Sequence, residues 1–410
     1  MKDQSKLSSY DFILPEEYIS NQLATPTDHC KLMVYDRKNQ TISHKHFYDI
    51  KGIINTNSML YFNDTRVIKA RLKLKNHLFV NYRWKLFKNR DREMFYVKSI
   101  DHDKHLFIVH PWWKFVVWSK IIIKEEGNGD QILEVIDTIG NTKVIRYDGD
   151  IFELLEKHWS MPLPHYIKDI ENTDQYQPIT ADPEKYWSVA SPTATLHFTQ
   201  QLINDIVDKW VEIDKVTLHI WLGTFQAIYT QDIRSHDIHT ESIQVSKNIF
   251  KKIYEDKLSG KKIIATGTTT CRTLESLWLA YLHLSTSQVD LLLGNDAHRR
   301  RKSRWKNIVD YYRKYIKRYK WYEDNQIVSD IIWWIVINSD IVNFTTKIYI
   351  TPGYKLQIID QMITNFHLPK SSLFIMISSI IWLDKALKCY NEAKEKDYKF
   401  YSLGDAMFIV

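Results

Sequence analysis

The sequence predicts an α/β protein in which a large α/β domain carries a smaller antiparallel β domain. The first observation is length, because 410 residues exceed the usual size of a single domain. Between residues 73 and 150, short apolar segments are separated by Asn, Asp, Lys and Gly, which is typical of an antiparallel sheet or small barrel. After residue 150, helical patterns alternate with strands, and this order favours parallel strands joined by helical crossovers.

These patterns place the large domain at residues 1–72 and 151–410 and the small domain at residues 73–150. In the small domain, strands are predicted at 79–82, 94–97, 106–109 and 120–123. In the large domain, helices are predicted at 198–210 and 246–258, and strands at 216–220 and 262–267. Because function in parallel sheets lies in the loops after the strands, polar residues at those points are the candidates.

Composition excludes several classes of protein. Apolar residues make up 44% and charged residues 26% of the chain, as in an ordinary globular protein. The three cysteines, Cys30, Cys271 and Cys389, lie far apart, which excludes a disulfide scaffold or zinc cluster and indicates a reducing compartment. No apolar stretch is long enough to span a bilayer, and residues 1–10 lack the apolar core of a signal peptide. We therefore expect a cytoplasmic protein with no membrane partner.

A basic segment stands out within a predicted insertion at about residues 285–346. Residues 299–320 contain eleven Lys or Arg residues and one acidic residue, Asp310. Such a segment can release counterions from the phosphates of a polyanion, or it can be a solvated helix. The sequence leaves these two interpretations evenly balanced.

No metal or nucleotide motif is complete. His236, His239 and Glu241 lie close together, but their spacing is not that of a helical His-Glu-x-x-His zinc site, so no metal is predicted. The turn at residues 267–270, Gly-Thr-Thr-Thr, could hold an anion but lacks the lysine and spacing of a Walker loop. A Gly-x-Gly-x-x-Gly motif after an early strand is also absent from the sequence, so a Rossmann dinucleotide site is not supported.

Several motifs in one order along the chain are more specific. They include Phe-Asn-Asp-Thr-Arg-Val at 62–67, Pro-Thr-Ala with Leu-His-Phe at 192–198, Thr-Leu-His at 217–219, Gly-Thr-Thr with Arg272 at 267–272, Thr-Asn-Phe-His-Leu-Pro at 364–369 and Gly-Asp-Ala-Met at 404–407. On these motifs the chain closely resembles the S-adenosylmethionine:tRNA ribosyltransferase-isomerase family of queuosine biosynthesis. The resemblance runs nearly from end to end. Only the small domain, which matches loosely, and the insertion fall outside it.

The resemblance implies a large barrel-like α/β domain with an inserted small antiparallel β-barrel. It implies that the ribosyl moiety of S-adenosylmethionine is transferred to 7-aminomethyl-7-deazaguanine at the wobble position of tRNA, giving epoxyqueuosine, adenine and methionine. S-adenosylmethionine is then a consumed substrate, and neither a metal nor another cofactor is expected. The partners are this substrate and tRNA, and a monomer is expected.

Such a reaction needs a base, an acid and groups that hold anions. We interpret His219, His236 and His239 as acid or base candidates, since the histidine pKa lies near working pH. Glu241 and Asp405 are candidates for amine or ribose contacts. The remaining candidates would bind the substrate, through its carboxylate or phosphates in the case of the two arginines: Arg66, Thr193, His197, Thr268, Thr269, Arg272, Asn365 and His367.

Tryptophan and glycine occur in unusual proportion, with 14 Trp and only 11 Gly. Tryptophan stands where the family pattern has glycine at Trp118, Trp159, Trp187, Trp210, Trp221 and Trp382, and Trp84 is a further candidate. Replacing the smallest side chain by the largest at so many sites would overpack turns and contacts. Our hypothesis is that UGA codons are read as glycine in the source lineage; the alternative is genuine tryptophan enrichment.

Two other functions are alternatives, and the first of them stays open. A noncatalytic RNA-binding paralogue would keep the fold and lose the pocket. The other, a methyltransferase that uses S-adenosylmethionine, is not supported, because the chain lacks a glycine-rich nucleotide loop. The products discriminate: adenine with methionine indicates ribosyl transfer, S-adenosylhomocysteine indicates methylation, and no product indicates binding alone.

Overall fold

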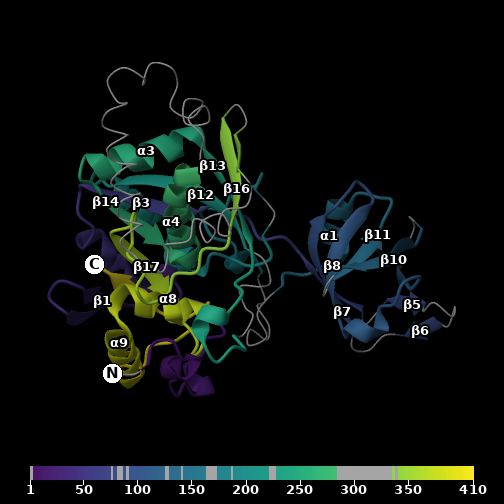
Figure 1. The fold of residues 1–410 in the computed structure, drawn as a ribbon, viewed down its shortest axis with the longest axis horizontal. Helices are drawn as coiled ribbons and strands as arrows, with labels where there is room; N and C mark the ends of the chain where they lie inside the picture. The colour runs from purple at the N-terminus through teal and green to yellow at the C-terminus, as the bar shows by residue number, and fades with distance from the viewer. Residues whose placement is uncertain are drawn as a thin grey trace. The chain divides into compact units, whose positions relative to one another are not determined.

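The computed structural model describes residues 3–74, 77–80, 86–88, 92–124, 129–139, 142–162, 173–185, 188–220, 228–283, 335–337 and 340–410. The chain divides into two compact units (Figure 1). The large unit comprises Met1–Arg66, His165–Lys185 and Ser191–Val410, and the small unit comprises Val67–Pro164 and Tyr186–Ala190. The basic segment at 299–320 lies outside the described residues.

The large unit is built on a ten-stranded mixed sheet in the order β15-β16-β13-β12-β3-β14-β17-β18-β1-β2 (Figure 1). At its centre β12, β3, β14 and β17 run parallel to one another, whereas β13 and β18 run antiparallel to β12 and β17. The strands are β1 (Lys31–Asp36), β2 (Thr41–His46), β3 (Ser58–Asn63), β12 (Glu212–His219), β13 (Glu241–Ser246), β14 (Lys262–Thr266), β15 (Ile335–Ile337), β16 (Ile341–Thr346), β17 (Gln361–Asn365) and β18 (Ala406–Ile409).

Helices cover both faces of this sheet. Leu60 and Phe62 of β3 pack in one core with Leu202 and Ile206 of α2 (Gln200–Val207) and with η4 (Phe47–Gly52). Alternate residues of a strand point to opposite faces, so the buried Met59 faces the other side. There α4 (Gly267–His283) contacts all four central parallel strands.

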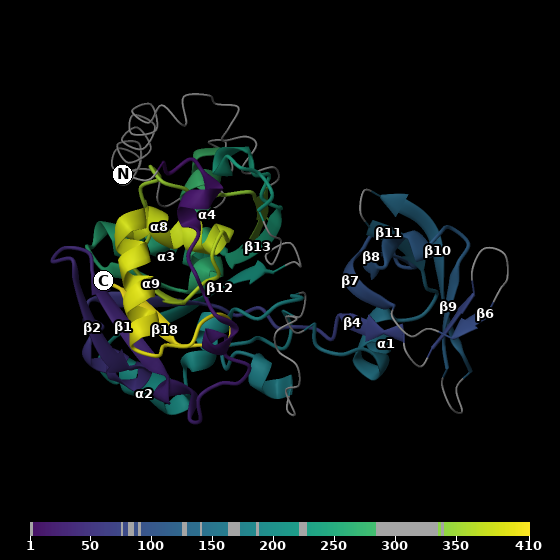
Figure 2. The same ribbon diagram turned by 90° about the horizontal axis from the view of Figure 1, so that it is seen from below.

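Three further α-helices are present in the described part of the large unit. Helix α3 (Lys247–Leu258) contacts β13 and β14, whereas α8 (Ser372–Ile381) packs against α9 (Leu383–Glu395), which Figure 2 shows close to β1 and β18. Side-chain caps fix where α2, α3 and α8 begin, because Thr199, Ser246 and Ser371 each accept a hydrogen bond from a backbone N–H of the first turn.

The α/β class predicted from the sequence is confirmed. The predicted strands at 216–220 and 262–267 correspond to β12 and β14, and the predicted helices at 198–210 and 246–258 correspond to α2 and α3. Residues 341–346 fell within the predicted insertion, but they form β16, whose Val342 and Phe344 are buried and which pairs with β13. This segment therefore belongs to the sheet.

The small unit contains an eight-stranded antiparallel sheet in the order β4-β7-β8-β11-β10-β9-β5-β6 (Figure 1). Burial alternates along it, as at Phe107 and Val109 of β8, so one face forms a core. Among the described residues the end strands β4 and β6 do not pair with each other, so closure into a barrel is not confirmed. The elements are β4 (Arg71–Lys73), β5 (Leu78–Val80), β6 (Leu86–Lys88), β7 (Glu93–Ser99), β8 (Lys104–His110), η6 (Trp112–Lys114), β9 (Lys120–Ile123), β10 (Gln131–Ile139), β11 (Thr142–Arg146) and α1 (Ile151–His158).

Across the residues that the structure describes, none of the helices has the length and apolar character needed to cross a membrane.

Candidate functional site

Most of the predicted site residues lie along one edge of the large sheet. The parallel strands β3, β12, β14 and β17 all end there, and the antiparallel strands β13 and β18 begin there. The short helix η8 (Thr193–His197) joins this edge by contacting β17 and α4. The predicted residues that this topology brings to the edge are Thr193, His197, His219, Glu241, Thr268, Thr269, Arg272, Asn365, His367 and Asp405.

The end of β3 connects three elements of the site. The buried Asn63 side chain donates to the backbone oxygen of Leu218 at 3.0 Å and to Thr269 Oγ1 at 3.3 Å. Its Oδ1 accepts from the backbone N–H of Leu218 at 3.0 Å. Asn63 therefore fixes the end of β12 relative to the start of α4.

The next residue, Asp64, is also buried and holds a lysine. Its carboxylate accepts from Thr217 Oγ1 at 2.7 Å and from Lys185 Nζ at 2.6 Å. A buried charge is tolerated when it is paired and hydrogen-bonded, and both conditions hold here. Asp64 thus places the Lys185 ammonium beside the end of β12.

His219, at the end of β12, is held in a defined position. Its Nδ1 lies 3.0 Å from Thr65 Oγ1. Burial, with a smaller effect from the Lys185 charge, lowers the pKa of His219 to about 4. The imidazole is therefore neutral at physiological pH, which is the form that can accept a proton.

The other two histidine candidates lie near β13. The ring of His236 packs edge-on against Tyr349 with 5.6 Å between centroids, and burial followed by the nearby His239 lowers its pKa. His239 Nε2 is 3.6 Å from Glu241 Oε1. The structure thus places His239, and not His236, within ion-pair distance of the predicted carboxylate.

Glu241 and Arg272 form a buried ion pair with each other. Arg272 Nη1 contacts Glu241 Oε2, and Nε donates to the backbone oxygen of Ile348 at 3.2 Å. Arg272 is 3% exposed and Glu241 is fully buried. Among the described residues, Arg272 Nη2 has no hydrogen-bond partner although it is buried. One donor of this cation is therefore still available to an acceptor.

Arg272 stands in the first turns of α4, directly after the strand-to-helix turn. Gly267 opens this helix with φ +88°, a conformation that favours glycine, and a Cβ there would be 3.5 Å from Cβ of Ala194 in η8. The buried Thr268 and Thr269 follow it. A helix N-terminus attracts anions through its unpaired N–H groups, so Arg272 and the start of α4 favour negative charge together.

A second set of buried polar groups lies at η8 and the end of β17. His197 Nδ1 is 3.2 Å from Cys30 Sγ, and burial lowers the pKa of His197 to about 4. His197 Nε2 and Asn365 Oδ1 are buried and lack hydrogen bonds of normal geometry within the described chain. His367 Nε2 lies 3.0 Å from Thr364 Oγ1, and burial lowers its pKa to about 3. These imidazoles are neutral donors or acceptors, not cations.

Three predicted residues differ in environment from this set. Asp405 accepts backbone N–H bonds from Lys31 at 2.6 Å and Lys399 at 2.7 Å, one on each oxygen, so its carboxylate connects the loop before β18 to β1. Arg66 is exposed, and Thr193 is half-buried at the start of η8.

Sequence reasoning did not single out Asn63, Asp64 and Lys185. Two of them lie in the Phe-Asn-Asp-Thr-Arg-Val motif, where an Asn-Asp pair directly after an apolar strand was an available signal. Lys185 carried no such signal, because it becomes part of the site only through its contact with Asp64.

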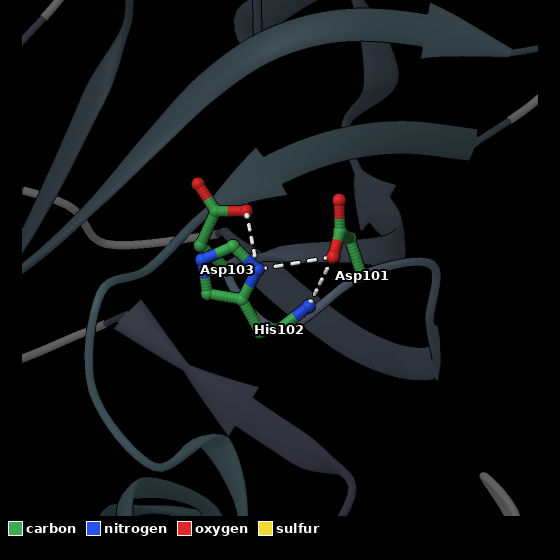
Figure 3. A group of neighbouring side chains, drawn as sticks. All are labelled: Asp101, His102 and Asp103. Atoms are coloured by element: carbon green, nitrogen blue, oxygen red, sulfur yellow. Dashed lines mark hydrogen bonds and ion pairs between the residues drawn. The ribbon is translucent and has the colours of Figure 1, made fainter.

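One group of side chains in the described chain has the proximity to hold a metal ion, and it lies in the small unit. Asp101, His102 and Asp103 are consecutive residues in the turn between β7 and β8 (Figure 3). His102 Nδ1 is 3.0 Å from Asp101 Oδ1, and this hydrogen bond raises the pKa of the imidazole. The group is mostly exposed, and its contacts are those of a polar turn. His236, His239 and Glu241 do not form such a group.

Together these features define a class: an α/β enzyme with a neutral imidazole, a buried cation at a helix N-terminus and paired carboxylates on one sheet edge. The chain belongs to the queuosine biosynthesis protein family, whose family model matches residues 7–309 and 327–409.

The similar proteins match over almost their whole length. The S-adenosylmethionine:tRNA ribosyltransferase-isomerase of Fusobacterium nucleatum is 35% identical over 414 residues, which cover 100% of this chain and 98% of the relative. The enzyme of the same name from Clostridioides difficile is 33% identical over 98% of this chain and 99% of the relative. The crystal structure of S-adenosylmethionine tRNA ribosyltransferase from Thermotoga maritima has 22% identity and a TM-score of 0.47, over 98% of this chain and 100% of that one.

Proposed function

We propose that this protein transfers and isomerises the ribosyl moiety of S-adenosylmethionine onto 7-aminomethyl-7-deazaguanine at the wobble position of tRNA. The products are epoxyqueuosine in the tRNA, free adenine and methionine. The observation that carries the proposal is full-length similarity to relatives that bear the name of this activity, at 33–35% identity with no large part of either chain left over. This length of match supports the catalytic interpretation over a noncatalytic RNA-binding paralogue.

The geometry supports a role for the start of α4 in holding the substrate. S-adenosylmethionine carries a carboxylate, and the N-terminal N–H groups of α4 with the available Nη2 of Arg272 suit an anion. Glu241 neutralises the other side of the guanidinium and fixes its orientation. Arg272 then binds the carboxylate, while Glu241 acts as a positioning residue.

His219 is the best-supported base among the three histidines. The transfer requires loss of a proton next to the sulfonium, and a neutral imidazole can take it. Thr65 fixes the ring of His219, and the Lys185 ammonium held by Asp64 disfavours the protonated form before substrate binds. His239, beside Glu241, is the second candidate and would supply the proton to the departing adenine. Asp405 positions the loop before β18 through its two backbone contacts.

We also propose the partners, the compartment and the oligomeric state of the protein. Acceptor tRNA and S-adenosylmethionine are the partners, no metal or other cofactor takes part, and the protein acts as a cytoplasmic monomer. The exposed Arg66 is available for a phosphate of the tRNA. The barrel-like closure of each unit that the family resemblance implies also belongs to this proposal.

The test is product analysis with the purified full chain, S-adenosylmethionine and tRNA that carries the deazaguanine. We expect adenine and methionine in equal amounts. His219→Ala and His239→Ala should each lower adenine release by ~100-fold or more, the usual contribution of a general acid or base. His44→Ala is the matched control. His44 lies on the edge strand β2, away from the end of β12, and its ring contacts Tyr398 and Glu392.

Each outcome has a clear meaning. Formation of S-adenosylhomocysteine would replace the proposal by methylation. Tight tRNA binding without any product would favour the noncatalytic paralogue. Full activity in both histidine variants would overturn their assigned roles and leave the reaction itself intact.

A further inference from the structure

Three tryptophans occupy backbone conformations that L-residues avoid. Trp118 has φ 72°, Trp210 has φ 65° and Trp382 has φ 71°. At positive φ the Cβ atom crowds the backbone, so a bulky residue there is a genuine outlier, whereas glycine adopts it freely. Tryptophan accounts for 14 of the 410 residues, yet it supplies three of the seven non-glycine residues with positive φ in the described part of the chain.

Trp382 gives the strongest backbone argument. It joins α8 to α9 with φ 71° and ψ 142°, and it carries no side-chain cap to α9. The small left-handed region open to other residues has ψ of about 30–60°. A ψ of 142° with positive φ lies far outside that region and close to one that is essentially restricted to glycine.

The turn that contains Trp210 is equivalent to a second turn before a strand of the same sheet, and that second turn contains glycine. It follows α2, stands two residues before β12, and its N–H donates to the backbone oxygen of Val207 three residues earlier. Gly260 follows α3, stands two residues before β14, and its N–H donates to the backbone oxygen of Lys257 three residues earlier. Gly260 has φ 80°. Left-handed residues that end helices are usually glycine. Of these two equivalent turns, one has glycine at this position and the other has tryptophan.

Trp118 lies in a tight turn of the small unit. The backbone N–H of Ser119 donates to the oxygen of Val116 at 3.0 Å, which makes Trp118 the third residue of a β-turn. Its φ is positive, whereas Val117 is not among the positive-φ residues. This combination is that of a type II turn, whose third position calls for glycine.

The side chains of these three tryptophans are also unlike those of a structural tryptophan. They are 67%, 85% and 66% exposed at residues 118, 210 and 382. By contrast, Trp278 is buried in α4, and its indole N–H donates to Tyr354 Oη at 3.0 Å. Exposure alone does not distinguish these three tryptophans from the others, because Trp113 is also 69% exposed and has no positive φ. The backbone conformation does distinguish them.

We infer that the protein made in its own cells carries glycine at positions 118, 210 and 382, because those cells read UGA as glycine. UGA differs from the tryptophan codon UGG only in its third base, so translating UGA as tryptophan places Trp at each such codon. The inference rests on backbone geometry and is independent of the proposed function. It separates these positions from Trp278, which is genuine tryptophan.

One consequence concerns the surface. A hollow of about 980 Å³ beside α9 is lined in part by Trp382, Leu387 and Lys388. With glycine at 382, the indole that forms part of the wall of this hollow is absent. Trp159 has φ −106° and gives no backbone argument, and Trp187 and Trp221 lie outside the described residues.

The direct test is peptide mass spectrometry of the protein purified from its source cells. We expect glycine at 118, 210 and 382 and tryptophan at 278, the internal control. Tryptophan at any of the three left-handed positions would overturn the inference for that position, and tryptophan at all three would overturn it entirely.

A recombinant comparison tests the physical basis. Starting from the printed sequence, Trp210→Gly and Trp382→Gly should each raise the unfolding midpoint by ~1–3 °C more than the corresponding alanine variants, because alanine retains a Cβ at positive φ. Trp278→Gly should lower the midpoint, and Gly260→Ala should lower it as well. Alanine variants as stable as the glycine variants would contradict the backbone argument.

Discussion

Two buried histidines make the stability of the large unit sensitive to acid. His197 and His367 have pKa values of about 4 and about 3, lowered by burial from 6.5. In the unfolded chain both bind a proton near pH 6.5, whereas in the folded chain they do so only near pH 4 and below. The unfolded state therefore binds more protons in this window, and stability falls as pH falls from 6.5 toward 4.

The size of the effect follows from these values. One pKa unit corresponds to about 1.4 kcal/mol. Each histidine should therefore lower the free energy of unfolding by about 2 kcal/mol when the pH falls from 7 to 5. Together they should remove about 4 kcal/mol. The buried carboxyl groups of Glu275 and Asp405, whose pKa values are raised by burial, act in the opposite direction. A single-site comparison at both pH values cancels that contribution.

The assay is hydrogen exchange of the slowest amides in β14 and β17, which reports the free energy of global opening. When the pH is lowered from 7 to 5, the free energy of unfolding of His197→Asn should fall by about 2 kcal/mol less than that of the starting protein. His102→Asn is the control, because the pKa of the exposed His102 is raised and its contribution has the opposite sign. An unchanged pH dependence in His197→Asn would refute the assignment of a buried neutral imidazole.

Three further predictions test the contacts of the site. Arg272→Met should lower the free energy of unfolding by about 3–5 kcal/mol, because it removes the buried guanidinium that contacts the buried Glu241 carboxylate; urea unfolding measures this. Lys185→Met should raise the pKa of His219, since one positive charge beside the ring is removed; NMR titration of the imidazole measures this. Asp405→Ala should lower the free energy of unfolding by about 1–3 kcal/mol, because two part-buried backbone N–H groups lose their acceptor.

A different result would contradict each of these three predictions. A stability loss below about 1 kcal/mol in Arg272→Met would mean that the ion pair is solvated. A His219 pKa that falls in Lys185→Met would mean that desolvation by the methionine outweighs the lost charge. For Asp405→Ala, unchanged stability together with abolished adenine release would assign the carboxylate to chemistry and not to positioning.

Much of the fold was readable from the sequence because local patterns and long-range packing agree. Thr199 and Ser246 start α2 and α3 as side-chain caps, and the apolar runs at 216–220 and 262–267 coincide with parallel strands. The strand at 341–346 was placed in the insertion, because what assigns it to the sheet is its pairing with β13 and β15 and not its own composition.

The site was only partly readable. The position of His219 at the end of a predicted strand was visible in the sequence. Its neutral state was not, because it comes mainly from burial in the fold, with a smaller effect from Lys185, which Asp64 holds from another segment. Glu241 and Arg272 were assigned to separate substrate contacts, whereas the structure pairs them with each other across β13 and α4. Pairings between segments depend on register and burial, and neither can be deduced from the residues alone.

The most direct test of the central claim follows the ribosyl carbons. The full chain is incubated with tRNA that carries the deazaguanine and with S-adenosylmethionine labelled with ¹³C in its ribose, and the tRNA nucleosides are then analysed by mass spectrometry. We predict that all five labelled carbons appear in one modified wobble nucleoside and that unlabelled adenine is released. Label that stays in S-adenosylmethionine, or in S-adenosylhomocysteine, would contradict the account.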